Sequence, residues 1–257
     1  MPVWTGAPLP STLVNSGGLE LAITEPLYNE QVNPGGGDPP YGLGTLINIS
    51  GVEPAYLSDR VNDSFNALRA RVNEVTGIDF LGTLSDALWD LDHRPQPGEP
   101  NRNWHRTGRA FSFNRNLVAG FPPPLEVVRE DTDLQTFWRV YVRVADAAQT
   151  GQLGEPLRRM PWDFQSRDRG DVEAYEQGGR LRDEIPPGYY VDLTQVAADY
   201  LWMRVPAGSD WRDNFNARNF WTFQKWDGLS WYEAMREIYA ESELGGWVPT
   251  ATPEGDG

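Results

Sequence analysis

Cysteine is absent from the 257-residue sequence, and histidine occurs at only two positions, His93 and His105. The absence of cysteine excludes a disulfide framework, a thiolate nucleophile and a metal site with cysteine ligands. Two histidines also leave few ways to build a catalytic base or a histidine-rich metal site. No run of about 18 apolar residues occurs, so the sequence predicts no transmembrane segment.

Basic residues are also scarce relative to acidic ones. Lysine and arginine together number 22, against 37 aspartates and glutamates, which gives a formal net charge of −15. A surface with this charge repels phosphate groups, so we expect no nucleic-acid partner. Hydrophobic residues make up 39% of the chain, and 11 tryptophans add large areas that can be buried. The chain is therefore expected to fold around a sizeable core.

Composition divides the chain into three parts. Residues 1–44 are rich in glycine and proline and are predicted to form a loop-rich N-terminal arm. Residues 45–244 are predicted to form a single α+β domain, an antiparallel sheet flanked by amphipathic helices. Residues 245–257 contain much proline and threonine, which is typical of a flexible linker. These ends suggest a module of a longer exported bacterial protein, located outside the cell or at the cell surface.

Two helices are predicted in the first half of the domain. The first has an N-cap at Ser58 or Asp59 and stops at Gly77. Its apolar residues recur at helical spacing, at Val61, Phe65, Leu68, Val72 and Val75. The second is predicted over 80–91, where Phe80, Leu84, Ala87, Leu88 and Leu91 would share one face.

An alternating pattern over 135–144 predicts a strand. One of its faces would be apolar, and the other would carry Arg139 and Arg143, for which internal pairing with acidic residues is expected. Residues 109–114 and 125–130 are predicted to be neighbouring strands in antiparallel pairing. The polar stretch 151–188 is predicted to be a long loop.

Capping signals predict two further helices. Asp192 can cap a helix over 193–201, followed by a short strand at 202–206. Ser230 and Glu233 form the pattern of a capping box at the start of the last helix. Both helices have an apolar stripe that can pack on the sheet.

The residues around His105 carry the most specific motif. The segment reads Asn103-Trp104-His105-Arg106-Thr107-Gly108-Arg109-Ala110-Phe111-Ser112. This spacing resembles the zinc-binding segment Ser-x-His-x-x-Gly-x-Ala-x-Asp of D-alanyl-D-alanine carboxypeptidases and their hedgehog-like relatives. The order of elements is similar too, and the resemblance covers about residues 45–240. It implies a hedgehog-like or D,D-peptidase-like fold.

The resemblance also implies that most of the zinc site is missing. Ser112 stands where the family has its aspartate ligand, and Asn103 stands in place of the leading serine. The family takes a second histidine ligand from near the end of the domain, about three residues after a catalytic glutamate. The matching stretch here, residues 216–223, contains no His, Glu or Asp. We therefore expect no metal, no cofactor and no catalytic residues.

The favoured hypothesis is a non-catalytic binding or architectural module derived from a peptidase-like fold. Its degenerate cleft would be formed by His105, Ser112, Phe220 and Trp221. The partner would be a cell-wall peptide, a glycan or another protein.

Two alternatives stay open from the sequence. One is an active zinc D,D-carboxypeptidase or other metallopeptidase that uses ligands outside the motif. The other is a carbohydrate-binding module, because five tryptophans occur within about thirty residues and indole rings can stack on sugars; these are Trp202, Trp211, Trp221, Trp226 and Trp231. A serine hydrolase is disfavoured, because neither histidine has a Gly-x-Ser-x-Gly motif near it.

Overall fold

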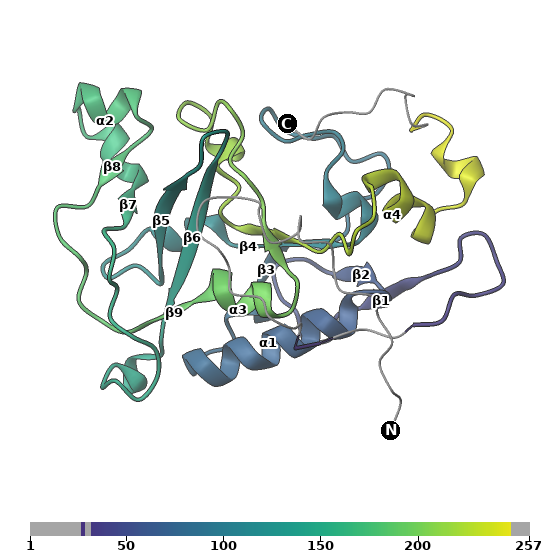
Figure 1. The fold of residues 1–257 in the computed structure, drawn as a ribbon, viewed down its shortest axis with the longest axis horizontal. Coiled ribbons are helices and arrows are strands. Elements are labelled where there is room, and N and C mark those ends of the chain that lie inside the picture. Colours follow the sequence, from purple (N-terminus) through teal and green to yellow (C-terminus); the bar gives the residue numbers. More distant parts are fainter. Residues whose placement is uncertain (1–26, 29–31, 248–257) are drawn as a thin grey trace.

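The computed structural model of the chain describes residues 27–28 and 32–247 (Figure 1). Within these residues, four α-helices accompany four small antiparallel sheets. The predicted α+β class is therefore confirmed. Most of the predicted arm, up to residue 26, and the tail from residue 248 lie outside the described residues. None of the helices described is long and apolar enough to cross a membrane.

The largest sheet has four strands in the order β10-β11-β4-β3. These strands are β3 (Leu84–Asp86), β4 (Ala110–Phe113), β10 (Met203–Arg204) and β11 (Thr222–Gln224). Side chains alternate between the two faces of each strand. One face is apolar and packs into the core, with Leu84, Phe111, Phe113 and Phe223. The opposite face is polar and carries Ser112 and Thr222, which lie side by side in the register of β4 and β11.

Helix α1 (Asn62–Thr76) packs on this core through its apolar stripe and ends at Gly77, whose left-handed φ of 74° closes the helix. It begins later than predicted, because Ser58 belongs to β2 (Tyr56–Ser58), which pairs with β1 (Leu43–Thr45). The Asp59 carboxylate accepts a hydrogen bond from the Gly42 amide instead of capping the helix. The predicted N-cap at Ser58 or Asp59 is therefore wrong.

The predicted helix over 80–91 is also wrong. This segment forms a single 3-10 turn at Phe80–Gly82, followed by β3. The amide of Leu84 donates to the Ser50 carbonyl at 2.9 Å, and β3 pairs with β4 on its other side. Phe80 and Leu84 are buried as the helical pattern required, but Phe80 is buried from a 3-10 turn and Leu84 from a strand.

A second sheet contains β5 (Leu125–Asp131), β6 (Thr136–Arg143) and β9 (Tyr190–Asp192), in the order β5-β6-β9. The predicted strands over 125–130 and 135–144 are confirmed, and the structure pairs them with each other in antiparallel register. The predicted strand over 109–114 exists as β4, but its predicted antiparallel pairing with 125–130 is wrong, because β4 pairs with β3 and β11 in the four-stranded sheet.

The two faces of the second sheet differ as expected. Trp138, Val140 and Val142 face the core. On the other face Arg139 pairs with Asp192 at 2.6 Å and with Glu130 at 3.7 Å, which confirms internal pairing.

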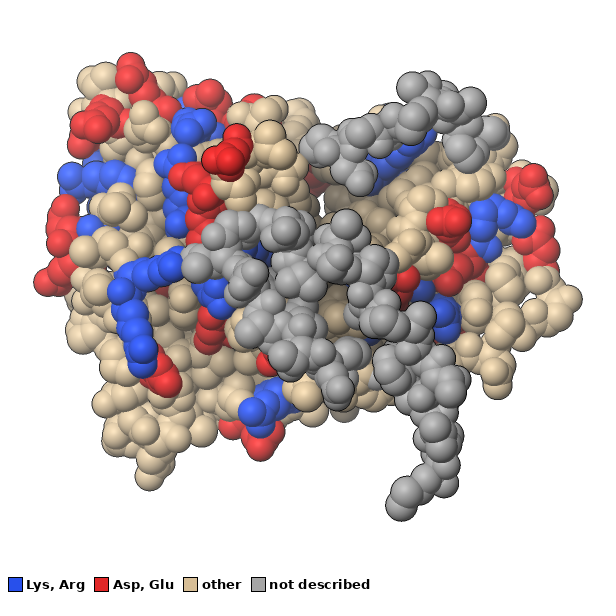
Figure 2. All heavy atoms as spheres, in the orientation of Figure 1, with Lys and Arg blue, Asp and Glu red and all other residues tan. Residues whose placement is uncertain are grey.

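The segment 151–188, predicted as a loop, contains short elements: β7 (Trp162–Asp163), α2 (Val172–Glu176) and β8 (Arg180–Leu181). Acidic and basic side chains are interleaved on the surface of this part of the molecule (Figure 2).

The capping signals predicted the last helices correctly. Asp192 caps α3 (Leu193–Asp199), and its carboxylate accepts from the Gln195 amide. Ser230 and Glu233 form a complete capping box at α4 (Trp231–Ile238). The predicted strand over 202–206 is limited to β10. The remaining 3-10 helices span Trp104–Thr107, Arg115–Val118, Asp146–Ala148, Phe164–Asp168, Phe215–Arg218 and Glu241–Leu244.

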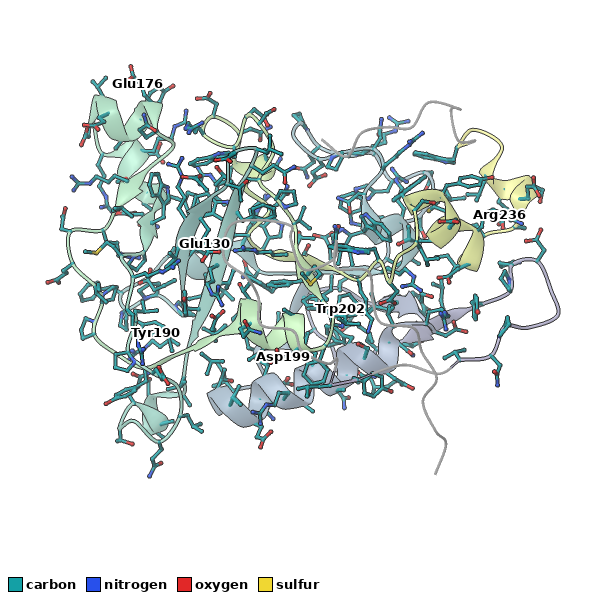
Figure 3. All side chains as sticks on the ribbon, viewed as in Figure 1. Glu130, Glu176, Tyr190, Asp199, Trp202 and Arg236 are labelled. Carbon is teal, nitrogen blue, oxygen red and sulfur yellow. The ribbon has the colours of Figure 1, made fainter. Side chains whose placement is uncertain are left out.

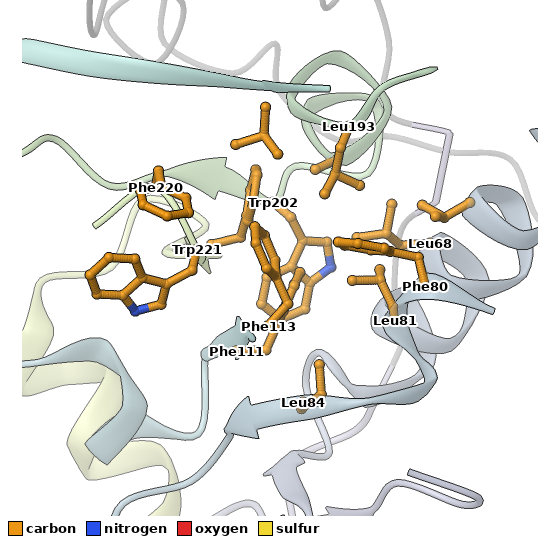
Figure 4. Close-up of a cluster of buried hydrophobic side chains, with 14 of the residues drawn as sticks. Leu68, Phe80, Leu81, Leu84, Phe111, Phe113, Leu193, Trp202, Phe220 and Trp221 are labelled. Carbon is orange, nitrogen blue, oxygen red and sulfur yellow. The ribbon is translucent and has the colours of Figure 1, made fainter. Parts of the chain in front are cut away.

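Aromatic side chains fill the space between α1, α3 and the two sheets (Figure 4). The Phe111 ring lies 5.0 Å from both Phe65 and Trp202, in edge-to-face contacts. Such pairs contribute beyond the area that they bury. This core fixes β4, the strand that carries Ser112, against α1.

Candidate functional site

The His105 motif folds into a turn that leads into β4. His105 lies in the 3-10 helix Trp104–Thr107, which ends at Gly108 with φ of 64°. A Cβ at residue 108 would lie 2.8 Å from the Ser58 amide nitrogen, so glycine is required there for space as well as for conformation. The turn brings Ser112, seven residues later, back against the His105 ring.

His105, Ser112 and Thr222 form a row of hydrogen bonds on the polar face of the four-stranded sheet. Ser112 Oγ lies 3.0 Å from His105 Nε2 and 2.8 Å from Thr222 Oγ1. All three side chains are buried, with residue exposures of 2% for His105, 1% for Ser112 and 7% for Thr222. The structure thus brings together two of the predicted site residues and adds Thr222.

Asn103 determines which groups donate and which accept in this row of hydrogen bonds. Its side-chain oxygen accepts from the His105 amide at 3.0 Å and lies 2.6 Å from His105 Nδ1. Because that oxygen can only accept, Nδ1 carries the proton and Nε2 is left as an acceptor. Ser112 therefore donates to His105, and Thr222 donates to Ser112.

Burial keeps the imidazole of His105 neutral. Desolvation, together with the nearby His93, lowers the pKa of His105 from 6.5 to about 3. Trp89 lies between the two histidines, with ring centroids 3.9 Å from His93 and 4.9 Å from His105. Trp89 and the burial of the ring leave no room for the solvation that a charged imidazole needs.

The hydrogen bonds that link Ser112 to His105 and His105 to Asn103 resemble those between a nucleophile, its base and an orienting group. Two features prevent this chemistry. The Ser112 hydroxyl is enclosed, so a substrate carbonyl cannot reach it. A histidine with a pKa of about 3 is also too weak a base to activate a hydroxyl near neutral pH. The row acts as a structural hydrogen-bond network.

Phe220 and Trp221, the other predicted site residues, are buried as well, at 2% and 7% exposure. The Phe220 ring stacks on Phe164 at 5.4 Å, and Trp221 stacks on Phe215 at 5.6 Å. Neither ring lines an opening beside His105. Both fill the core at the start of β11.

The nearest carboxylate in the sheet belongs to Asp86, which lies opposite Ser112 across an irregular pairing of β3 and β4. Its carboxylate accepts from Trp89 Nε1 at 3.1 Å, and burial raises its pKa. Across the part of the chain that the structure describes, no group of three or more His, Asp or Glu side chains could hold a metal ion.

Sequence reasoning missed Thr222 and the role of Asn103. Thr222 falls within the 216–223 stretch, in which only His, Glu or Asp would have been a ligand signal. Its place opposite Ser112 follows from the pairing of β4 with β11. Comparison of the chain with models of protein families, with curated proteins and with solved structures finds no match.

Proposed function

We propose that this chain is a non-catalytic binding or architectural module, built on a hedgehog-like or D,D-peptidase-like fold whose zinc site has become a hydroxyl network. The observation that carries the proposal is the meeting of His105, Ser112 and Thr222 in one buried row. His105 and Ser112 occupy two ligand positions of the resembling motif. Thr222 comes from the stretch in which that family has its third ligand.

The surroundings of His105 support this origin. A histidine that ligates a metal donates its other ring nitrogen to an oxygen acceptor, which orients the ring. His105 has that arrangement, with Nδ1 donating to Asn103 and Nε2 left free of a proton. It points, however, at a hydroxyl. Neutral hydroxyls are poor zinc ligands, so the position is oriented for a metal but lacks the donors to hold one.

The residue at the position of the family's catalytic glutamate also supports a non-catalytic module. Three residues before Thr222 is Asn219, an amide that can neither take up nor release a proton at neutral pH. Its side-chain nitrogen donates to the Pro206 carbonyl at 2.9 Å, and its backbone is left-handed with φ of 55°. Asn219 stabilises a turn in this structure and offers no base for hydrolysis.

In this proposal the partner is a cell-wall peptide, a glycan or another protein, bound outside the cell or at its surface. Because the row around His105 is enclosed, binding would use the outer surface and not the former zinc position. Stacking of sugars on Trp202, Trp211 or Trp221 is disfavoured, because all three are buried.

Restoring the ligands tests the origin of the network. The double variant Ser112→Asp/Thr222→His should bind zinc together with His105, while each single variant, with two ligands, should bind it far more weakly. Zinc at 100 times its dissociation constant should add about 2.7 kcal/mol to the free energy of unfolding. Metal content and melting temperature with and without a chelator measure both effects.

A second double variant guards against a failure to fold. Ser112→Cys/Thr222→Cys is close to the native side chains in size and should give a Cys2His site that binds cobalt with the absorption of a thiolate complex. A folded double variant of either kind that takes up no more metal than the wild type would overturn the proposed origin.

A further inference from the structure

A small pocket lies apart from the His105 row, and none of its lining residues belongs to that row. Its volume is about 250 Å³, and it opens between three 3-10 helices, Arg115–Val118, Phe164–Asp168 and Phe215–Arg218. Its lining combines aromatic, aliphatic, amide, cationic and acidic groups, among them Phe164, Ala119, Asn116, Arg167, Arg218 and Asp213.

Arg218 is the unusual group in this pocket. The residue is only 4% exposed, yet its guanidinium makes no hydrogen bond or ion pair with any residue that the structure describes, and its Nε is buried without a partner. The guanidinium carbon lies 4.2 Å from the centre of the Phe164 ring and 4.6 Å from that of Phe215. With its faces on rings, Arg218 has its in-plane N–H donors left for a ligand.

The other buried arginines in the described part of the chain all have oxygen partners. Arg106 donates to four main-chain carbonyls of the 90–101 segment. Arg109 pairs with Asp227 and Glu237, and Arg204 pairs with Glu130. A buried guanidinium without an anion or carbonyl partner is costly. Among the described residues, Arg218 is therefore the buried arginine whose donors are best placed to take an oxygen ligand.

The neighbours of Arg218 indicate which anion fits. Arg167 adds a second cation, and its own partner Asp213 is an exposed side chain, 3.2 Å away. Burial, then the charge of Arg167, lowers the pKa of Arg218 to about 10, so Arg218 stays cationic at neutral pH. The exposed Asp168 and Asp213 at the rim oppose a doubly charged phosphate more than a singly charged carboxylate.

We propose that this pocket binds a small organic carboxylate, with the carboxylate on the N–H edge of Arg218 and the apolar part against Phe164, Phe215 and Ala119. The volume is below the range of about 300–1,000 Å³ that holds drug-sized ligands. A small organic acid or the C-terminal residue of a peptide fits this size. The inference stands on Arg218 and does not depend on the proposed function.

The test uses the full chain and matched probes: N-acetylalanine, N-acetylalanine amide, and inorganic phosphate. Isothermal titration should detect binding of N-acetylalanine, and the amide, which lacks the carboxylate, should bind at least about tenfold more weakly. Arg218→Met should weaken N-acetylalanine binding by at least about tenfold as well. Arg94→Met, which removes an exposed arginine that does not line the pocket, should leave it unchanged.

The melting temperature of unliganded Arg218→Met separates a ligand-binding role from a structural one. It should equal or exceed that of the wild type, because the substitution removes a buried charge that lacks a partner. The proposal is overturned if N-acetylalanine does not bind, if it binds the Arg218→Met variant as well as the wild type, or if phosphate alone binds.

Discussion

Arg204 and Arg218 are two buried arginines with different partners. Both are less than 10% exposed, both lie over aromatic rings, and burial lowers the pKa of both. Arg204 donates to Glu130 at 2.6 Å, whereas Arg218 has no carboxylate or carbonyl partner among the described residues. The comparison shows that a highly acidic chain does not supply a counter-ion to every buried cation. Arg218 has no counter-ion among the described residues, and a pocket lies beside it.

Glu130 is the centre of the paired region. It lies near the end of β5 (Figure 3) and contacts Arg139, Arg159 and Arg204 at 3.7, 3.0 and 2.6 Å. Glu126 is a third buried charged residue, and it is only partly paired. Glu126 pairs with Arg182 at 3.0 Å through one oxygen, but its other oxygen is buried without a partner.

Glu130→Gln should give the largest loss of stability. The substitution leaves Arg204 buried without its carboxylate, which costs about 3–5 kcal/mol. Denaturant unfolding measures the loss. Glu155→Gln, in an exposed pair with Arg158, is the matched control and should change the free energy of unfolding by less than about 0.5 kcal/mol. Equal effects of the two substitutions would mean that the Glu130 cluster is not a paired buried site.

Ser112→Ala should cost about 1–3 kcal/mol, because it removes the middle of the buried row and leaves His105 Nε2 and the Thr222 hydroxyl without partners. Ser85→Ala is the control, since its hydroxyl donates to the Phe113 carbonyl from an exposed position where water can replace it. A loss no greater than that of the control would contradict a buried hydrogen-bond network around His105.

Glu126 should make stability fall with rising pH. Burial raises its pKa from 4.5 to about 7, so the folded chain holds a proton that the unfolded chain releases. Its contribution is present below about pH 4.5 and is lost as the pH rises to about 7, with a slope of at most about 1.4 kcal/mol per pH unit. The difference between wild type and Glu126→Gln across this range measures it, and parallel profiles would contradict it.

Arg218→Met should give the smallest effect, a change within about 0.5 kcal/mol or a gain in the free energy of unfolding, because no partner is left behind. This result, together with the loss in Glu130→Gln, would show that removing a buried arginine without a carboxylate partner costs less stability than removing the carboxylate of a paired one. A loss above about 1 kcal/mol would show that Arg218 stabilises the fold through Phe164 and Phe215, as cation–π contacts can.

Local signals in the sequence predicted much of the fold. Asp192 and the Ser230–Glu233 pair cap their helices as expected, because a cap depends on residues a few positions apart. The prediction of a helix over 80–91 was wrong. The apolar spacing of this segment suits a helix, but the pairing of β3 with β4 determines its structure. That pairing joins residues that are far apart in the chain, so the local spacing of apolar residues does not predict it.

The candidate site was predicted only in part. His105 and Ser112 were placed together from a motif that spans seven residues. Thr222 lies 110 residues beyond Ser112 and carries no ligand signal, so only the register of β4 and β11 reveals it. Phe220 and Trp221 were expected at an open cleft and are enclosed. The missing partner of Arg218 is a property of the arrangement in space, which composition cannot show.

The proposed loss of the metal site is tested by the zinc content of the wild-type chain after equilibration with zinc, measured together with hydrolysis of a D-alanyl-D-alanine peptide. A row of one neutral histidine and two hydroxyls is expected to retain no stoichiometric zinc and to support no hydrolysis. One zinc per chain, removed by a chelator together with peptide hydrolysis, would contradict the proposal that the residues around His105 do not hold a catalytic metal.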